Sequence, residues 1–177
     1  MKSFLNRIWA ATSSTLYHGS PSKFSKFKKP NQGKDYGVGI YFTENKKEAL
    51  EYIDEDEGGY LYSVELNISK PFNVRDKEQA KKLSDVLGLD WQVVLDNELW
   101  KDPSTGYSSD DADNFYLKII DELSNIVKSQ GLSWYKAYDL FDPAFKKLGF
   151  DCIHDKKKRW WVVKDPNKIK ILKVTKV

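Results

Sequence analysis

The residues best suited to chemistry lie in three short segments near the start of the chain. His18 belongs to a Leu-Tyr-His-Gly-Ser segment, Tyr41 to a Gly-Val-Gly-Ile-Tyr-Phe segment, and Tyr52 follows eleven residues after Tyr41. Gly37 and Gly39 precede the first of these tyrosines, and glycine permits a positive φ angle or a close approach of the backbone to a ligand. Together these segments can offer a ligand an imidazole, two phenol rings and accessible backbone groups.

Two predicted elements position the tyrosines. Over residues 40–43, apolar side chains alternate with tyrosine and threonine, which is typical of a strand with one apolar and one mixed face. Asn45 can cap a helix over residues 46–53, whose apolar stripe is flanked by Tyr52. The sequence therefore predicts a strand that carries Tyr41 and a short helix behind it that carries Tyr52.

This order of segments resembles the nicotinamide pocket of ADP-ribosyltransferases of the diphtheria-toxin and poly(ADP-ribose) polymerase type. The family pattern is His-Gly-Ser or His-Gly-Thr on a first strand, then a Gly-x-Gly-Ile-Tyr-Phe strand, then a helix with a second tyrosine. Here the three parts are His18-Gly19-Ser20, residues 37–42 and Tyr52. The resemblance covers about residues 15–70 and, less closely, 148–173; it leaves out residues 1–14 and 75–145.

The resemblance implies that NAD lies in a cleft between two halves of a split sheet. His18 would hydrogen-bond a ribose hydroxyl, and the Gly19 backbone would hold the nicotinamide carboxamide, with Ser20 at its edge. Tyr41 and Tyr52 would sandwich the nicotinamide, because a flat cationic ring suits two aromatic faces. The residues expected to bind NAD are His18, Gly19, Ser20, Gly39, Tyr41, Tyr52 and Trp160.

Each of these residues also suits a structural role when taken alone. His18 can be a satisfied histidine at a strand end, Tyr41 and Tyr52 can be half-buried aromatics, and Gly37 and Gly39 can form a bulge. The occurrence of all of them, in order and at the family spacing, favours the binding site.

Two positions depart from the resembled family. The serine that often stands three residues before the second tyrosine is Ala49 here, so one hydrogen bond to the carboxamide is missing. The family's glutamate, which begins a Glu-Tyr-Val-Val-Phe-Asp-Pro strand, is replaced by Trp160 in Trp-Trp-Val-Val-Lys-Asp-Pro. That glutamate bonds the nicotinamide ribose and favours the positive charge that develops as the glycosidic bond breaks, which an indole cannot do.

A carboxylate from the neighbouring strand is the expected replacement. Residues directly opposite in a hairpin lie about 5 Å apart on one face. With a loop over residues 156–158, His154 is opposite Trp160; with a loop over residues 156–159, Asp155 is opposite Trp160. We therefore expect Asp155, and less readily His154, to reach the ribose. The alternative, equally supported by turn preferences, is that Asp155 only begins a lysine-rich turn. The expected catalytic residues are Asp155, Tyr41 and His18.

Composition sets the outer bounds. The length of 177 residues suggests one domain with a sizeable core, and 40% hydrophobic with 31% charged residues is normal for a soluble globular protein. No apolar run approaches the roughly 20 residues of a membrane-spanning helix. The single cysteine, Cys152, excludes an internal disulfide and fits a reducing compartment, so we expect a cytoplasmic protein. Paired Cys/His metal spacing, a Gly-x-Ser-x-Gly elbow and a Walker loop are absent from the sequence, so no metal is expected.

The charges are segregated although the net charge is only +3. One basic cluster comprises Lys23, Lys26, Lys28, Lys29 and Lys34, and a second comprises residues 156–159. These clusters suit solvated loops. They also suit a basic rim that attracts a pyrophosphate or an acidic target.

The rest of the chain predicts an α+β fold. The expected strands are residues 15–18, 40–43, 60–67, 151–155, 160–164 and 169–174, with Pro71 ending the third; the expected helices are 77–87, 91–100, one capped by Asp113, and 135–148, continuous or broken at Pro143. The elements indicate a split, mostly antiparallel sheet with a helical insertion at about 75–148, and the resemblance implies that this sheet is of the ADP-ribosyltransferase type. We expect residues 1–14 to form a short helix and linker, and residues 15–177 to form a single domain.

The resemblance implies a mono-ADP-ribosyltransferase that binds NAD, releases nicotinamide and transfers ADP-ribose to a macromolecule. A protein acceptor is expected, and nucleic acid is the alternative suggested by the two basic clusters. An inactive binding module with the same fold is the other alternative, because Trp160 replaces the glutamate. The acceptor itself, the activity and the oligomeric state do not follow from the sequence.

Overall fold

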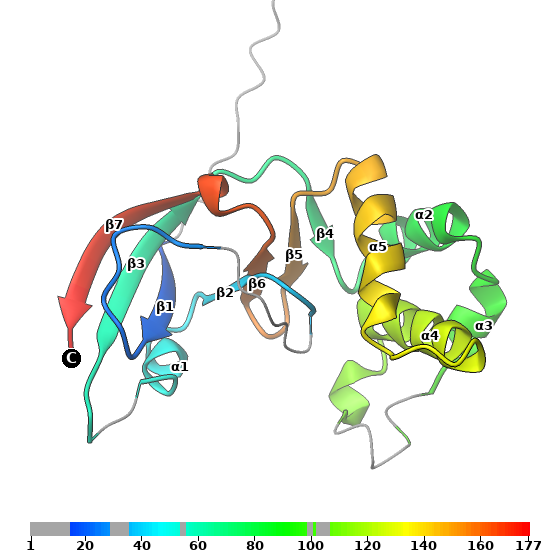
Figure 1. Cartoon of the computed structure of the whole chain (residues 1–177), viewed down its shortest axis with the longest axis horizontal. Helices are drawn as coiled ribbons and strands as arrows, with labels where there is room; N and C mark the ends of the chain where they lie inside the picture. The colour runs from blue at the N-terminus through cyan, green and yellow to red at the C-terminus, as the bar shows by residue number, and fades with distance from the viewer. Residues whose placement is uncertain (1–14, 29–35, 54–55, 99–100, 102–106) are drawn as a thin grey trace, which may run out of the picture.

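The computed structural model describes residues 15–28, 36–53, 56–98, 101 and 107–177. The strands are β1 (Leu16–Ser20), β2 (Ile40–Thr43), β3 (Tyr60–Leu66), β4 (Pro71–Asn73), β5 (Cys152–Asp155), β6 (Trp160–Val163) and β7 (Ile169–Lys176). Together these strands form a seven-stranded sheet in the order β4-β5-β6-β2-β1-β3-β7 (Figure 1). The helix predicted over residues 1–14 lies outside the described residues.

The sheet is split between β1 and β2. Neighbouring strands are antiparallel except β4 and β5, which are parallel. Five register pairs join β1 to β3 and four join β2 to β6. Within the described part of the chain, β1 and β2 share a single register pair, Tyr17 with Thr43. The prediction of an α+β fold with a split, mostly antiparallel sheet is confirmed.

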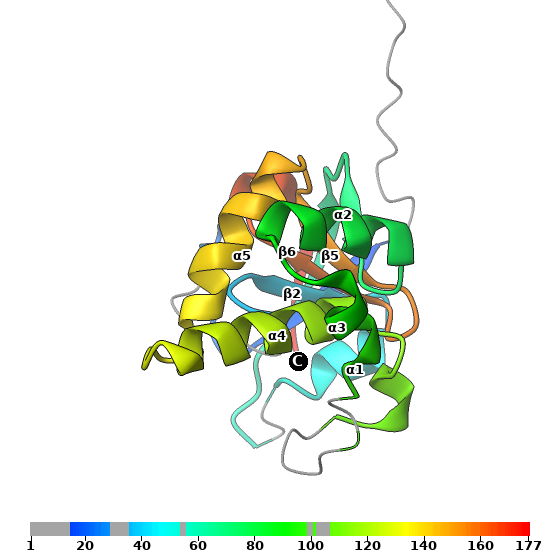
Figure 2. The same ribbon diagram turned by 90° about the vertical axis from the view of Figure 1, so that its right-hand side faces the viewer.

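The helices are unevenly distributed over the sheet. They are α1 (Lys46–Leu50), α2 (Lys77–Leu87), α3 (Trp91–Asp96), α4 (Phe115–Ser129) and α5 (Lys136–Lys147), with the 3-10 turns η3 (Ser109–Asp111) and η4 (Pro166–Lys168). Helices α2 to α5 gather beside β4 and β5, whereas α1 packs alone on β1 and β2 (Figures 1 and 2). The helical insertion expected at about 75–148 corresponds to α2 to α5.

Two apolar cores use opposite faces of the sheet. Val162 of β6 belongs to the core that also contains the inner faces of α2, α4 and α5. Its neighbours Trp161 and Val163 belong to the second core, which lies under the loop after β1 and includes Phe27. Successive residues of a strand point to opposite faces, so β6 supplies side chains to both cores. The Trp160 and Tyr41 side chains pack against the first core.

Several predicted boundaries differ from the structure. Asn114, rather than Asp113, caps α4, because its side chain accepts a hydrogen bond from the Leu117 amide. Helix α3 ends at Asp96, since Asn97 has an extended backbone, whereas the prediction continued to residue 100. Helix α5 is continuous through Pro143. Strand β4, which begins at Pro71, was not predicted, because Pro71 was expected to end a strand.

Within the described residues, none of the helices combines the length and the apolar character needed to cross a membrane.

Candidate functional site

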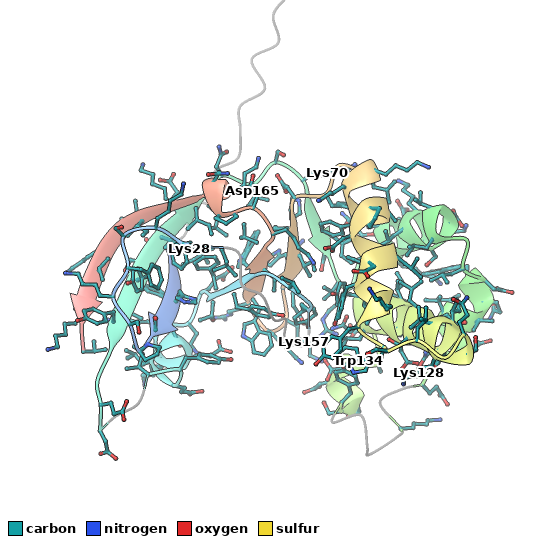
Figure 3. All side chains as sticks on the ribbon, in the orientation of Figure 1. Lys28, Lys70, Lys128, Trp134, Lys157 and Asp165 are labelled. Carbon is teal, nitrogen blue, oxygen red and sulfur yellow. The ribbon has the colours of Figure 1, made fainter. Side chains whose placement is uncertain are left out.

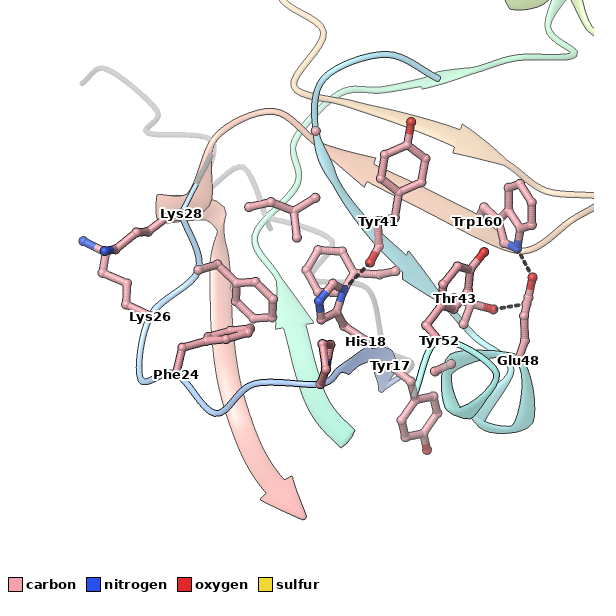
Figure 4. A pocket seen from close by; sticks show the side chains of 17 residues that line it. Tyr17, His18, Phe24, Lys26, Lys28, Tyr41, Thr43, Glu48, Tyr52 and Trp160 are labelled. Carbon is pink, nitrogen blue, oxygen red and sulfur yellow. Dashed lines mark hydrogen bonds between the residues drawn. The ribbon is translucent and has the colours of Figure 1, made fainter. Parts of the chain in front are cut away.

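A cavity of about 630 Å³ opens at the split of the sheet. Its walls come from β1, the loop over residues 21–28, β2, helix α1 and Trp160 of β6. Figure 4 shows Lys26 and Lys28 at one end, His18 near the middle, and Tyr41, Tyr52, Glu48 and Trp160 toward the other end. The volume lies within the range of small-molecule sites, which is about 300–1,000 Å³.

His18 is held by a contact with a backbone carbonyl and by the aromatic rings that surround it. Its Nδ1 lies 2.8 Å from the Tyr41 carbonyl oxygen, which can only accept, so Nδ1 carries the proton. The rings around the imidazole, with centroids 5.2–6.3 Å away, are Phe24, Phe27, Phe42 and Tyr62. This environment fixes the His18 ring against the wall of the cavity.

Tyr41 is fixed by the turn that precedes its strand. Its hydroxyl donates to the Gly37 carbonyl at 2.9 Å and accepts from the Tyr36 amide at 3.0 Å. Gly37 has a φ angle of 74°, and a Cβ there would lie 2.6 Å from the Tyr138 ring. Both facts mean that any other residue at Gly37 would be strained. The glycine therefore allows the chain to fold back on the Tyr41 hydroxyl.

The other predicted glycines allow close packing. A Cβ on Gly19 would lie 1.9 Å from the Ala49 carbonyl oxygen, so α1 rests directly on the β1 backbone. A Cβ on Gly39 would lie 2.5 Å from the Val162 side chain. Tyr52, just beyond α1, is 52% exposed and lines the cavity. The short contact at Gly19 thus sets how close Tyr52 comes to the first strand.

Ser20 is not among the residues that line the cavity. Its hydroxyl donates to the Ser22 carbonyl at 3.0 Å and accepts from the Ser22 amide at 3.2 Å. The Ser20 side chain therefore stabilises a turn and does not point into the cavity, where the predicted contact with the carboxamide or ribose would require it.

Glu48 is the cavity residue that sequence reasoning missed. The Trp160 indole Nε1 donates to its Oε1, and the Thr43 hydroxyl donates to its Oε2 at 2.6 Å. Thr43 and Trp160 are a register pair across β2 and β6, so both donors come from one face of the sheet. Glu48 precedes Tyr52 by four residues, which would put both on one face of the helix predicted over residues 46–53. In the structure α1 ends at Leu50, so Tyr52 lies in the turn that follows it. That spacing is the signal by which the sequence could have revealed it.

Asp155 is directly opposite Trp160, as the longer of the two predicted hairpin loops requires. Its carboxylate is nevertheless only 1% exposed and is not part of the cavity wall. It accepts hydrogen bonds from the Tyr36 hydroxyl at 2.8 Å, from Arg75 Nε at 3.2 Å, and from the amides of Lys157 at 3.0 Å and Lys158 at 3.2 Å. The structure therefore does not bring Asp155 to the cleft, because these donors hold it in the interior.

The pKa of Asp155 follows from the same contacts. Burial opposes its ionisation, but the hydrogen bonds from Arg75 and Tyr36 outweigh burial, and the pKa lies below its usual value. His154, the second candidate for the acid, is 8% exposed and stacks on Trp161 with a centroid separation of 3.6 Å. Burial lowers the His154 pKa to about 4, so the imidazole is neutral near pH 7. His154 does not line the cavity either.

The two predicted basic clusters have different environments. Lys26 and Lys28 line the cavity. Lys157 and Lys158, at the turn between β5 and β6, form ion pairs with Asp110 at 3.0 Å and Asp111 at 2.9 Å. Figure 3 shows Lys28 and Lys157 well apart on the molecule. Lys29 and Lys34 lie outside the described residues.

The described residues contain no group of three or more His, Cys, Asp or Glu side chains arranged to hold a metal ion.

Comparison with known proteins identifies the family. A family model described as ADP-ribosyltransferase in polyvalent proteins matches residues 12–175. No curated protein matches the sequence significantly. A solved structure named as the crystal structure of an anti-CRISPR protein is similar over 95% of this chain and 99% of that chain, with 16% identity and a TM-score of 0.42, values too low to carry an argument. Because the family model spans nearly the whole sequence, the chain belongs to the ADP-ribosyltransferases found in polyvalent proteins.

Proposed function

We propose that the protein is a mono-ADP-ribosyltransferase that binds NAD in the cavity at the split of the sheet, releases nicotinamide, and transfers ADP-ribose to a macromolecule, with a protein as the expected acceptor. The observation that carries this proposal is that His18, Tyr41 and Tyr52, from three separate segments, line one cavity. Their order in the sequence also resembles that of the diphtheria-toxin and poly(ADP-ribose) polymerase type.

The arrangement of the cavity suggests how NAD lies in it. The nicotinamide ring would stack between Tyr41 and Tyr52, since aromatic faces attract a flat cation. The adjoining ribose would lie near His18, and the diphosphate would extend toward Lys26 and Lys28, which line the opposite end. Ammonium groups there would offset the two negative charges of the diphosphate.

The reaction follows from the charge of the leaving group. When the bond between ribose C1′ and the nicotinamide nitrogen breaks, both electrons leave with nicotinamide, and positive charge develops on the ribose. A nucleophile of the acceptor then bonds to C1′ and loses a proton. Trp160 stands where the polymer-forming relatives have a glutamate that helps to activate an acceptor hydroxyl, so a single transfer is favoured over chain growth.

A matched pair of variants tests the binding site. Tyr52→Ala removes a cavity ring that is 52% exposed, and Tyr135→Ala removes a ring that is 59% exposed on the helical part of the molecule. We expect Tyr52→Ala to weaken NAD binding about tenfold, given stacking and cation–π contributions of about 0.5–1.5 kcal/mol each. Tyr135→Ala should leave binding unchanged. Calorimetric titration with NAD measures both, and equal affinities for all three proteins would contradict the site.

Activity is tested with NAD labelled in the adenylate part and a cell lysate as the source of acceptors. We expect release of free nicotinamide together with label on macromolecules. A protein that binds NAD but yields neither product would instead be the inactive binding module, which the presence of Trp160 and Ala49 favours.

Transfer to nucleic acid remains the alternative acceptor chemistry. Lys157 and Lys158 already form ion pairs with Asp110 and Asp111. The attraction would therefore come mainly from the exposed lysines of the first basic cluster, of which Lys23, Lys26 and Lys28 are described. Binding of DNA or RNA should then weaken steeply with added salt, and a flat salt response would exclude this acceptor.

A further inference from the structure

We propose that Glu48 is a catalytic residue of this transferase, and that Trp160 and Thr43 are the residues that position its carboxylate. The inference rests on the proposed function, since it names the acid of the same NAD site. It reassigns the role for which Asp155 was the candidate in the sequence, because Glu48 lines the cavity and Asp155 does not.

Two hydrogen bonds hold the Glu48 carboxylate, and a third orients one of the two donors. Trp160 Nε1 donates to one of its oxygens, and the Thr43 hydroxyl donates to the other at 2.6 Å. Thr43 Oγ1 in turn accepts from the Asn45 amide at 3.0 Å, which directs its own proton toward Glu48. The Thr43 side chain is buried, whereas Glu48 and Trp160 are partly exposed, so the carboxylate is held from the interior and can still meet a ligand. The carboxylate thus has a fixed position on the cavity wall (Figure 4).

Both donors to Glu48 are neutral. Among the described residues, no lysine or arginine forms an ion pair with Glu48, whereas Asp155 is paired with Arg75. A carboxylate oxygen that accepts one hydrogen bond has a second lone pair for another partner. Within the described part of the chain, the negative charge of Glu48 is therefore not offset by an ion pair with lysine or arginine, and it can interact with a positive charge in the cavity.

This charge has a defined use in the reaction. The bond between C1′ and the nicotinamide nitrogen breaks, its electron pair leaves with nicotinamide, and the ribose becomes cationic. The Glu48 carboxylate stabilises that cation by attraction. As the oxygen or nitrogen of the acceptor bonds to C1′, its proton passes to a Glu48 oxygen and then to water. No oxidant, reductant or metal is required.

The position of Trp160 explains why a tryptophan can stand where the resembled family has a glutamate. Trp160 occupies the place of the family's glutamate, at the start of β6. Its indole nitrogen presents a proton to Glu48 on the facing helix. The acid is therefore carried by α1 instead of β6, and the tryptophan that replaces it fixes the new carboxylate.

The hairpin offers a matched control one residue away. Trp161 Nε1 donates to Glu44 Oε1 at 3.1 Å, so a second tryptophan–glutamate pair joins the same two segments. Trp161 belongs to the core on the other face of the sheet, and neither member lines the cavity. Both pairs can stabilise the fold. Only the pair of Glu48 and Trp160 lines the cavity and can contact a bound substrate.

The test uses the full chain and measures nicotinamide release from NAD with water as acceptor. Glu48→Gln keeps an oxygen that can accept a hydrogen bond but removes the charge, and Glu44→Gln does the same at the control pair. We expect Glu48→Gln to lower kcat by a factor of about 100 or more, comparable to other single-group deletions in the stabilisation of charge. The dissociation constant for NAD should change less than threefold, and Glu44→Gln should match the wild type in both measures.

A second set of variants separates position from charge. Trp160→Phe removes the N–H donor together with part of the indole ring, as Trp161→Phe does at the control pair. We expect kcat of Trp160→Phe to fall several-fold, and adding Trp160→Phe to Glu48→Gln should cause little further loss. Trp161→Phe should leave kcat unchanged. Glu48→Asp retains a carboxylate and should be at least tenfold faster than Glu48→Gln, which keeps the test valid if the amide variant folds poorly.

The outcomes for Glu48 and for the proposed function are distinguishable. If the wild type releases nicotinamide and Glu48→Gln does so at the same rate, Glu48 is not catalytic although the transferase assignment stands. If the wild type binds NAD without releasing nicotinamide, the transferase assignment and the role of Glu48 are both overturned.

Discussion

Trp160 has two carboxylates as neighbours, Asp155 and Glu48. They differ in exposure, in position relative to the cavity and in the groups that donate hydrogen bonds to them. Asp155, across the hairpin, is 1% exposed and accepts hydrogen bonds from Tyr36, Arg75 and two backbone amides. Glu48, on α1, lines the cavity and accepts from two neutral donors. A buried carboxylate paired with a cation has a structural role, because removing it leaves its partner buried and unpaired. A carboxylate at a cavity wall, held by neutral donors, can instead act on a ligand.

The contacts of Asp155 connect distant parts of the chain. The Arg75 side chain, which follows β4, reaches Asp155 with Nε and Asp113 with Nη1. Tyr36 Oη donates to Asp155 and accepts from the Asn114 side chain at 3.0 Å. Asp155 therefore connects the hairpin of β5 and β6 to the start of α4 and to the turn before β2.

The largest effect is expected from removing this connection. Asp155→Ala leaves Arg75 and Tyr36 without their partner, and breaking a buried ion pair costs about 3–5 kcal/mol. Urea unfolding measures the free energy of unfolding, with Asp110→Ala as the control because that carboxylate is exposed. If Asp155→Ala unfolds at the same urea concentration as the wild type, the structural role assigned to Asp155 is wrong.

The next effect is the pH dependence of stability. Burial lowers the His154 pKa from 6.5 to about 4, while Glu44 and Asp155 raise it and Lys156 lowers it further. The unfolded chain thus binds a proton below pH 6.5 that the folded chain excludes until about pH 4. Stability should be complete above pH 6.5 and fall by up to about 3 kcal/mol as the pH decreases to 4.

Asp155 acts in a lower pH window. Its pKa in the folded protein is below the usual value, so its contribution is present above about pH 4 and is lost as the pH falls further. Urea unfolding at a series of pH values measures both windows. His154→Gln should flatten the curve between pH 6.5 and 4 and leave the loss below pH 4 intact; an unchanged curve would contradict the role of His154.

A smaller effect is expected at the basic end of the cavity. Lys26→Ala and Lys28→Ala should each weaken NAD binding about threefold and reduce its dependence on salt, because exposed charge pairs contribute about 0.2–1 kcal/mol. Lys23 lies in the same loop but does not line the cavity, so Lys23→Ala is the control. Titration with NAD at two salt concentrations checks this, and equal losses for all three variants would indicate a general effect of charge.

The comparison also explains which features the sequence could predict. The Asn45 cap follows from the local sequence, and the split sheet and the aromatic cavity wall follow from the family resemblance; the structure has all three. Strand β4 was not predictable from a proline rule, because Pro71 is the first residue of an edge strand, where a missing N–H is tolerated.

The acid of the site required tertiary information. Register statistics correctly allowed Asp155 to face Trp160, but whether a carboxylate lies in a cavity or in the interior depends on residues far along the chain. Tyr36 and Arg75 are 119 and 80 residues away from Asp155. Likewise, the Glu48 carboxylate is held by a hydrogen bond from Trp160, which is 112 residues later in the chain.

The most direct test of the account is a crystal structure of the Glu48→Gln variant with NAD, which slow turnover should leave intact. We expect the nicotinamide ring between Tyr41 and Tyr52, the adjoining ribose near His18 and beside residue 48, and the diphosphate toward Lys26 and Lys28. Nicotinamide bound outside this cavity, or its ribose closer to Asp155 than to residue 48, would contradict the account.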